Sequence, residues 1–340
     1  MNMPFAIKSA GMISGVGLNA EASCAAIRCA IDNFEETRFM DNGGEWILGS
    51  QVPLEKPWRG RKKLVKMAVR AINDCLSKTK ISIANLPLFL CVAEKHRPGR
   101  FDGIDRTLFN EIATEMGTSF HEKSQIFAYG RVAGGAAMNQ ARKLLYQDHL
   151  PYCLIVGVDS LLVAQSLAAY EELDRLLTSN NSNGFIPGEA ASAVLIGLPD
   201  TANPDELICY GIGLGKENAF LGSGEPLRGD GLVQAIRELE SDSGRQLKDS
   251  DFRITDISGE QYYFKEASLA VLRILRDLKE EYDIWHPADC VGEVGAAIVP
   301  ILLNVLMTAK EKDYLPGENV LLHSGNDKGE RVAMMLGFLQ

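Results

Sequence analysis

Short, uninterrupted runs of apolar residues recur along the chain, separated by segments with helical periodicity. Runs of this kind are typical of strands that are buried on both faces. In the first half they predict strands at residues 5–10, 88–93, 124–129, 152–159 and 190–197. In the second half they predict strands at residues 207–213, 251–258, 318–324 and 330–338.

The segments between these runs have the apolar spacing of helices. They predict helices at residues 20–31, 63–77, 106–116, 132–146, 231–240, 265–279 and 294–309. Asn19 is a favourable N-cap for the first of them, and Glu21 lies in its first turn. Because strands and helices alternate, we expect an α/β fold with mostly parallel sheets.

Two of the predicted helices open with similar runs of small residues. One begins Val132-Ala-Gly-Gly-Ala-Ala, and the other begins Val291-Gly-Glu-Val-Gly-Ala-Ala. Each is followed by a buried strand, and small residues let helix backbones approach closely. Either these are two unrelated Ala-rich helices, or the chain consists of two pseudo-repeated halves, residues 1–198 and 199–340, with the two helices at the centre.

Composition limits the classes of partner. The 340 residues carry a formal net charge of −10, which argues against a general nucleic-acid binder or an anionic membrane surface. The longest apolar stretch, residues 296–306, is too short to span a bilayer, and the N-terminus predicts no signal peptide. The basic run Arg59-Gly-Arg-Lys-Lys is either a solvated helix start or a docking patch for an acidic partner.

The cysteines and histidines predict neither disulfides nor a metal site. Seven cysteines lie singly in mostly apolar surroundings, which is typical of reduced, buried thiols in the cytoplasm. There is no Cys-x-x-Cys pair and no cluster of histidines, so we expect no metal and no cofactor.

The order of several segments resembles that of a known family. The segments that carry the resemblance are Gly11-Met-Ile-Ser-Gly-Val-Gly-Leu-Asn, Val156-Gly-Val-Asp-Ser, Asn183-Gly-Phe-Ile-Pro-Gly-Glu-Ala-Ala-Ser-Ala-Val-Leu-Ile and residues 292–297. Together they resemble the β-ketoacyl-acyl-carrier-protein synthases (3-oxoacyl-ACP synthases) of the thiolase-like superfamily, over nearly the whole chain. The resemblance implies a five-layer αβαβα fold built from two related halves.

The resemblance also implies where catalytic residues should lie. The family uses a cysteine at a helix N-terminus as nucleophile, together with two His or one His and one Asn. The nucleophile position falls at Gly130 or Arg131, one His position at about Glu260, and the other at Gly292, which Glu293 follows. None of these is a Cys or His. The closing glycine-rich loop of the family is also altered, to His323-Ser-Gly-Asn-Asp-Lys-Gly-Glu.

The substituting residues allow two interpretations. Arg131, Glu260 and Glu293 should converge on the former active-site pocket, where they would form a salt-bridged plug. Alternatively, two carboxylates beside an arginine would perform hydrolytic or proton-transfer chemistry. His286 and His323 flank the motifs and are either further site residues or ordinary loop histidines.

The resemblance therefore implies a non-condensing homologue that acts by binding. It would resemble either the chain length factors, which are partners of an active subunit, or the accessory factors of type VI secretion effectors. The alternatives are an active 3-oxoacyl-ACP synthase with a displaced nucleophile, and a hydrolase that uses Glu260 and Glu293. We expect a homodimer formed through residues 124–129, or a heterodimer with a paralogue, and an acyl carrier protein or a secretion effector as further partner.

Overall fold

The structure, a computed structural model, describes residues 3–84, 86–200, 202–277 and 279–338. Within these residues the largest feature is a mixed sheet in the order β10-β9-β11-β12-β8-β1-β7-β6-β4-β5. A separate two-stranded sheet pairs β2 with β3. The strands are β1 (Phe5–Ile13), β2 (Phe34–Met40), β3 (Trp46–Ser50), β4 (Leu88–Cys91), β5 (Gln125–Phe127), β6 (Tyr152–Ser160), β7 (Glu189–Gly197), β8 (Leu207–Lys216), β9 (Phe252–Thr255), β10 (Ile284–Trp285), β11 (Asn319–Gly325) and β12 (Glu330–Phe338).

Helices cover both outer faces of the sheets and fill the space between them. The helices are α1 (Ala20–Arg28), α2 (Gly60–Ser77), α3 (Leu108–Met116), α4 (Ala133–Tyr146), α5 (Ala164–Glu172), α6 (Asp230–Ser243), α7 (Gln261–Ile274), α8 (Ala288–Val291) and α9 (Ile298–Glu311). Short 3₁₀ turns are η1 (Gly130–Val132), η2 (Leu247–Asp249) and η3 (Gly295–Ala297). No helix among the described residues is long and apolar enough to cross a membrane.

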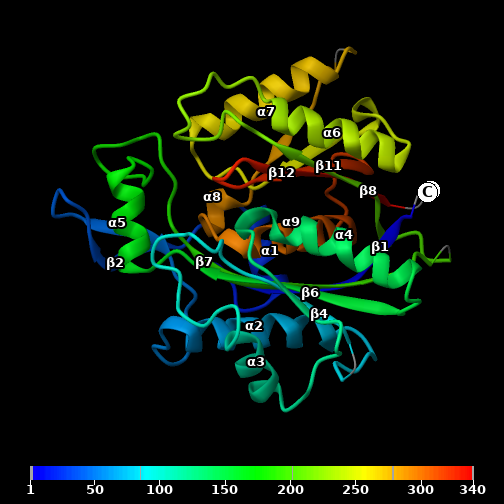
Figure 1. Cartoon of the computed structure of the whole chain (residues 1–340), viewed down its shortest axis with the longest axis horizontal. Coiled ribbons are helices and arrows are strands. Elements are labelled where there is room, and N and C mark those ends of the chain that lie inside the picture. The colour runs from blue at the N-terminus through cyan, green and yellow to red at the C-terminus, as the bar shows by residue number, and fades with distance from the viewer. Residues whose placement is uncertain (1–2, 85, 201, 278, 339–340) are drawn as a thin grey trace.

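The elements stack in five layers (Figure 1). Helices α6 and α7 cover the half of the sheet that contains β8, β11 and β12, while α2 and α3 cover the half that contains β1, β4, β6 and β7. Helices α4 and α9 lie between the two halves. A short antiparallel pairing of β1 with β8 joins the halves into one continuous sheet. The five-layer αβαβα fold predicted from the sequence is confirmed.

The two halves of the sheet repeat the same pairing pattern. From the outer edge inward, β5, β4 and β6 are parallel, and β7 and β1 follow antiparallel. In the other half β10, β9 and β11 are parallel, and β12 and β8 follow antiparallel. The predicted pseudo-repeat is therefore present in the topology. The division into an N-terminal half, residues 1–198, and a C-terminal half, residues 199–340, stays a prediction.

The expectation of mostly parallel sheets is wrong. The pairings that join neighbouring strands of the large sheet include more antiparallel than parallel ones. One physical reason is the short connection between β11 and β12, since a tight turn can join only antiparallel strands. Alternation of strand and helix along the sequence does not reveal the direction of each strand, because a reversal of direction depends on the length of the connection between two strands.

The sequence located the long elements better than the short ones. Asn19 caps α1 as predicted, its side-chain oxygen accepting a hydrogen bond from the N–H of Ala22 at 2.8 Å. Strand β1 extends beyond the predicted end at residue 10, because residues 11–13 continue the pairing with β7. Gly11 lies against α2, where an added Cβ would come within 2.2 Å of the Cys75 nitrogen. The prediction missed β2, β3, α5, β10 and α8.

The two central helices cross closely because α4 begins with small residues and the turn η3, which leads into α9, consists of small residues. A Cβ added to Gly134 of α4 would lie 2.7 Å from the Cβ of Val299 in α9. Helix α9 is buried along most of its length, as its continuous apolar sequence predicted. The crossing brings η1 and η3, at the N-terminal ends of α4 and α9, to the centre of the molecule.

Candidate functional site

Two glycines with positive φ begin the central 3₁₀ turns η1 and η3, and a carboxyl group packs against each glycine. Gly130 opens η1 with φ of 58°, and Gly295 opens η3 with φ of 53°. An added Cβ would lie 2.0 Å from a Glu94 carboxyl oxygen at Gly130 and 2.1 Å from an Asp159 carboxyl oxygen at Gly295. At Gly130, one of the two predicted nucleophile positions, the Glu94 carboxyl therefore occupies the place of a side chain.

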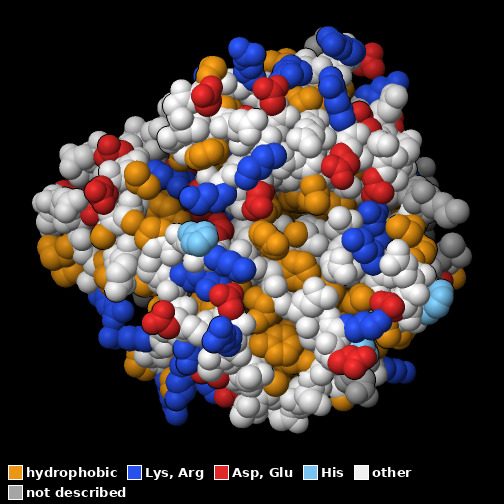
Figure 2. Space-filling model, viewed as in Figure 1, with side chains coloured by type: hydrophobic (Ala, Val, Ile, Leu, Met, Phe, Trp, Pro, Cys, Tyr) orange, Lys and Arg blue, Asp and Glu red, His pale blue; other side chains and the backbone are white. Residues whose placement is uncertain are grey.

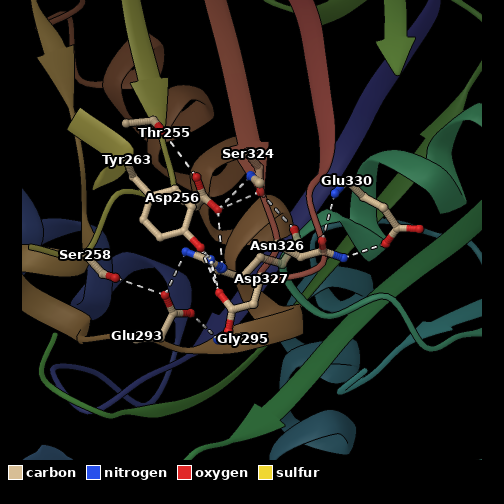
Figure 3. Close-up of polar contacts among 12 residues, drawn as sticks. Thr255, Asp256, Ser258, Tyr263, Glu293, Gly295, Ser324, Asn326, Asp327 and Glu330 are labelled. Atoms are coloured by element: carbon tan, nitrogen blue, oxygen red, sulfur yellow. Dashed lines mark hydrogen bonds and ion pairs between the residues drawn. The ribbon is translucent and has the colours of Figure 1, made fainter. Parts of the chain in front are cut away.

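Arg131, the other predicted nucleophile position, is buried and surrounded by acidic side chains. Its guanidinium nitrogens lie 2.9 Å from Asp327, 3.4 Å from Glu293 and 3.7 Å from Asp256. It also donates a hydrogen bond to the hydroxyl of Tyr263 and lies over that ring, 4.4 Å from its centre. Figure 3 shows the carboxyl groups of Asp256, Glu293 and Asp327 and the Tyr263 hydroxyl pointing toward one another.

The buried carboxylates are held in place by further hydrogen bonds. Glu293 accepts one from the Ser258 hydroxyl at 3.0 Å and one from the N–H of Gly295 at 2.9 Å (Figure 3). Asp256 accepts one from the Ser324 hydroxyl at 2.9 Å. Satisfied acceptors of this kind make it possible to keep several charges in the protein interior.

A second buried arginine extends the cluster. Arg175 forms a bidentate pair with Glu260, both distances being 2.8 Å, and also contacts Asp327 at 2.7 Å. Asp327 therefore bridges Arg175 and Arg131. The structure brings Arg131 and Glu293 together, as the sequence predicted, whereas Glu260 reaches the same cluster only through Arg175 and Asp327.

Burial and the two arginines set the charge states of the cluster. Burial raises the pKa of Glu293 to about 7, although Arg131 acts in the opposite direction. Burial also acts to raise the pKa of Asp327, but Arg175 and Arg131 outweigh it and hold that pKa well below its usual range. Burial disfavours the charge of Arg131, but Tyr263 and the carboxylates, Glu293 first among them, raise its pKa well above the usual value, so Arg131 stays charged.

Little space remains inside the cluster. A gap of about 10 Å³ lies between Arg131, Arg175, Glu293 and Asp327. Such a volume holds about one water molecule. An open cleft of about 1110 Å³ lies beside the cluster and reaches Arg175, Glu260 and Asp327. On the molecular face in Figure 2, hydrophobic side chains are visible between charged side chains of both signs.

The remaining candidate residues lie outside the ion-paired cluster. Gly292 has φ of 72°, and an added Cβ would lie 2.8 Å from the carbonyl oxygen of Ile186. The backbone conformation and the lack of space therefore require glycine at this position. His323 is buried on β11, where its Nδ1 lies 3.3 Å from the Thr255 hydroxyl. Burial lowers the pKa of His323 to about 3, which keeps the ring neutral. His286 pairs with Asp289 away from the cluster.

Four members of the cluster were missed in the sequence. Asp256 directly follows β9, and a charged residue at the end of an apolar run is a signal that could have indicated it. Asp327 lies in the turn between β11 and β12, within the loop of residues 323–330 that the sequence had already singled out. Tyr263 lies in a helix whose start the sequence placed four residues too late, at residue 265 instead of Gln261. We find no sequence signal for Arg175.

The buried cysteines have the properties of core residues. Burial raises the pKa of Cys290 to about 11 and that of Cys209 to about 12, and it raises the pKa of Cys153 still further. The cysteines are unpaired, and all except Cys29 are buried. Within the described residues, no group of three or more His, Cys, Asp or Glu side chains is arranged to hold a metal ion. The cytoplasmic location expected from the cysteines stays a prediction.

Sequence comparisons find no relatives of this chain, and structure comparisons find many. No protein-family model matches, and no curated protein matches. Similar solved structures include "The ishigamide ketosynthase/chain length factor", with a TM-score of 0.79, 16% identity and 100% of both chains covered. Another is "Ketosynthase (ApeO) in Complex with its Chain Length Factor (ApeC)" from Xenorhabdus doucetiae, with a TM-score of 0.72, 12% identity and 98% of both chains covered. A third is a β-ketoacyl synthase from Burkholderia phymatum STM815, with a TM-score of 0.75, 13% identity and 100% of both chains covered. At these identities the likeness shows the fold, which is that of the thiolase-like ketosynthases.

Proposed function

We propose that this chain is a non-condensing homologue of the 3-oxoacyl-ACP synthases that acts as the binding partner of a second thiolase-like subunit. The observation that carries the proposal is the Arg131 cluster. Where a condensing enzyme needs a nucleophile, this protein has a buried, ion-paired guanidinium, and the gap beside it is only about 10 Å³. Glu94 fills the neighbouring space beside Gly130.

The cysteines weigh against an active synthase with a displaced nucleophile. A nucleophilic cysteine needs a lowered pKa, which a helix N-terminus or a nearby cation provides. Here Cys91 and Cys153 lie within strands, and burial raises the pKa of both. The small gap likewise weighs against a hydrolase, because Glu293 has no space beside it for a substrate and Glu260 is held by Arg175.

A heterodimeric role has support from the similar structures. Two of them are named for a ketosynthase together with a chain length factor. In this chain β5 (Gln125–Phe127) is the outer strand of one half of the sheet, so its free edge is available to a second subunit. A second copy of this chain or a paralogue with an intact nucleophile would pair there.

Intact-mass measurement tests the absence of condensing chemistry. After incubation with acyl and malonyl carrier proteins, or with the ketosynthase inhibitor cerulenin, we expect the mass of the folded protein to remain unchanged. The physical reason is that no thiolate lies at the N-terminus of α4. A condensing synthase with its nucleophilic cysteine, treated in parallel, should gain the acyl or inhibitor mass. Stoichiometric acylation of any residue of this chain would contradict the proposal.

Sedimentation tests the predicted subunit contact. We expect a dimer at micromolar concentration, and Tyr129→Glu should shift it toward the monomer by placing a charge next to the edge strand. Leu272→Glu is the matched control, because both side chains are exposed hydrophobics, at 45% and 74%, and Leu272 lies on α7. A monomeric wild type that also fails to pair with a thiolase-like paralogue would refute the binding role.

A further inference from the structure

Asp327 differs from the other carboxylates of the buried cluster in its exposure and position. Its side chain is 30% exposed, whereas those of Arg131, Asp256 and Glu293 are 3–7% exposed. It lies on the short turn between β11 and β12 and lines the open cleft of about 1110 Å³. It is therefore the one acidic member that joins the guanidinium groups of Arg131 and Arg175 and can also be reached from the cleft.

Three donors point at the carboxyl group of Asp327. Arg131 contacts it at 2.9 Å, Arg175 at 2.7 and 3.1 Å, and the Tyr263 hydroxyl donates to it at 2.8 Å. Two arginines and a hydroxyl around one carboxylate are the usual components of a carboxylate-binding site. The charge of Asp327 is favoured at this place, since both arginines lower the pKa of its carboxyl group.

Each arginine keeps another acidic partner if Asp327 moves away. Arg131 retains Glu293 and Asp256, and Arg175 retains its bidentate contact with Glu260. Replacing the Asp327 carboxylate by the carboxylate of another molecule also leaves the number of buried charges unchanged. Such an exchange therefore avoids the large cost of leaving an arginine unpaired in the interior.

We propose that Arg131, Arg175 and Tyr263 form a binding site for the carboxylate of a small organic acid with an apolar body, and that Asp327 occupies this site as an internal ligand when the acid is absent. The apolar body would lie in the cleft, whose lining includes Tyr129, Leu173 and Phe220. Leu173 is 65% exposed, so burying it under such a body is favourable.

Chemical rescue of Asp327→Ala tests the carboxylate site. The substitution removes the carboxyl group but keeps the Cβ, so formate fits the space that is left. We expect the variant to melt at a lower temperature than wild type and formate to raise its Tm. At about tenfold excess over its Kd, formate should raise the Tm by about 2 °C. Sodium chloride at the same ionic strength should have no comparable effect.

Two matched variants separate a site from a general salt effect. Asp327→Asn removes the charge but leaves no space, so formate should not raise its Tm. Asp105→Ala removes the acidic partner of Arg100 at the same cleft, where one arginine supplies both donors to a carboxylate that is 43% exposed, and it should also show no rescue. Equal effects of formate on Asp327→Ala and Asp105→Ala would overturn the proposal, as would no effect on either.

Hexanoate tests the apolar part of the proposal. Isothermal titration should show hexanoate binding to Asp327→Ala at least tenfold more tightly than to wild type, because the internal competitor is gone. Adding Arg175→Gln to Asp327→Ala should abolish the binding, and hexanol, which lacks the carboxylate, should not bind. Rescue by formate without binding of hexanoate would refute the apolar cleft, and equal affinities in both proteins would refute the competition by Asp327.

Discussion

Replacing Arg131 with alanine is expected to lower the free energy of unfolding by about 3–5 kcal/mol. The substitution removes the guanidinium that Asp256, Glu293 and Asp327 all contact in the intact protein. Asp327 keeps its ion pair with Arg175, whereas Asp256 and Glu293 lose the cation that faces them. Uncompensated charges in the interior are among the costliest defects that a single substitution can produce. Urea unfolding at pH 7.5, followed by circular dichroism, measures the loss.

The same residue type in an exposed ion pair provides the control. Arg273 pairs with Asp230 on the surface, where the two side chains are 42% and 59% exposed. Arg273→Ala should change the free energy of unfolding by less than about 0.5 kcal/mol. If the two arginine variants lose similar stability, the ion pairs of Arg131 do not make the large contribution to the free energy of unfolding that we assign to them.

Replacing Glu293 with glutamine should change how stability depends on pH. The pKa of Glu293 in the folded protein is about 7, above the value of about 4.3 for an unperturbed glutamate. Between these pH values the folded state binds more protons than the unfolded state, so the contribution of Glu293 to stability falls as the pH rises. Relative to wild type, Glu293→Gln should therefore gain up to about 3 kcal/mol between pH 4.5 and pH 7.5.

Asp327→Asn should change the pH dependence of stability in the opposite direction. Because the arginines hold the pKa of Asp327 below its usual value, its contribution is complete above about pH 4 and is lost as the pH falls further. The difference in the free energy of unfolding between wild type and Asp327→Asn should therefore change only in strong acid.

A Glu293→Gln variant whose stability difference from wild type stays constant from pH 4.5 to 7.5 would contradict the assigned protonation of Glu293.

Much of the fold could be predicted because its main elements are local patterns. The apolar runs of β6 and β7, the small-residue start of α4 and the small residues of η3 before α9 each indicate their own structure. The strand directions could not be predicted in the same way. They depend on which strands meet across the sheet, as in the pairing of β1 with β7, and no local pattern records that.

The candidate site was predicted to a smaller extent. The family resemblance indicated Arg131 and Glu293, because the runs of small residues beside each of them could be aligned with the family's motifs. Glu260 was placed near the right segment, but its partner Arg175 comes from a loop after α5 without a recognisable motif. Ion-pair partners 85 residues apart leave no periodic signal, since each is selected by a contact that exists only after folding.

The central position of β1 has a consequence for synthesis on the ribosome. Strand β1 leaves the ribosome well before its partners, because Ala6 pairs with Gly197 on one side and with Ile208 on the other. Its partners emerge only after roughly ten to forty seconds of translation at usual bacterial and eukaryotic rates. Until then an apolar strand with two unpaired edges remains open to wrong partners, and closing so long a loop slows folding. Nascent chains that end before residue 207 should accordingly depend on chaperones.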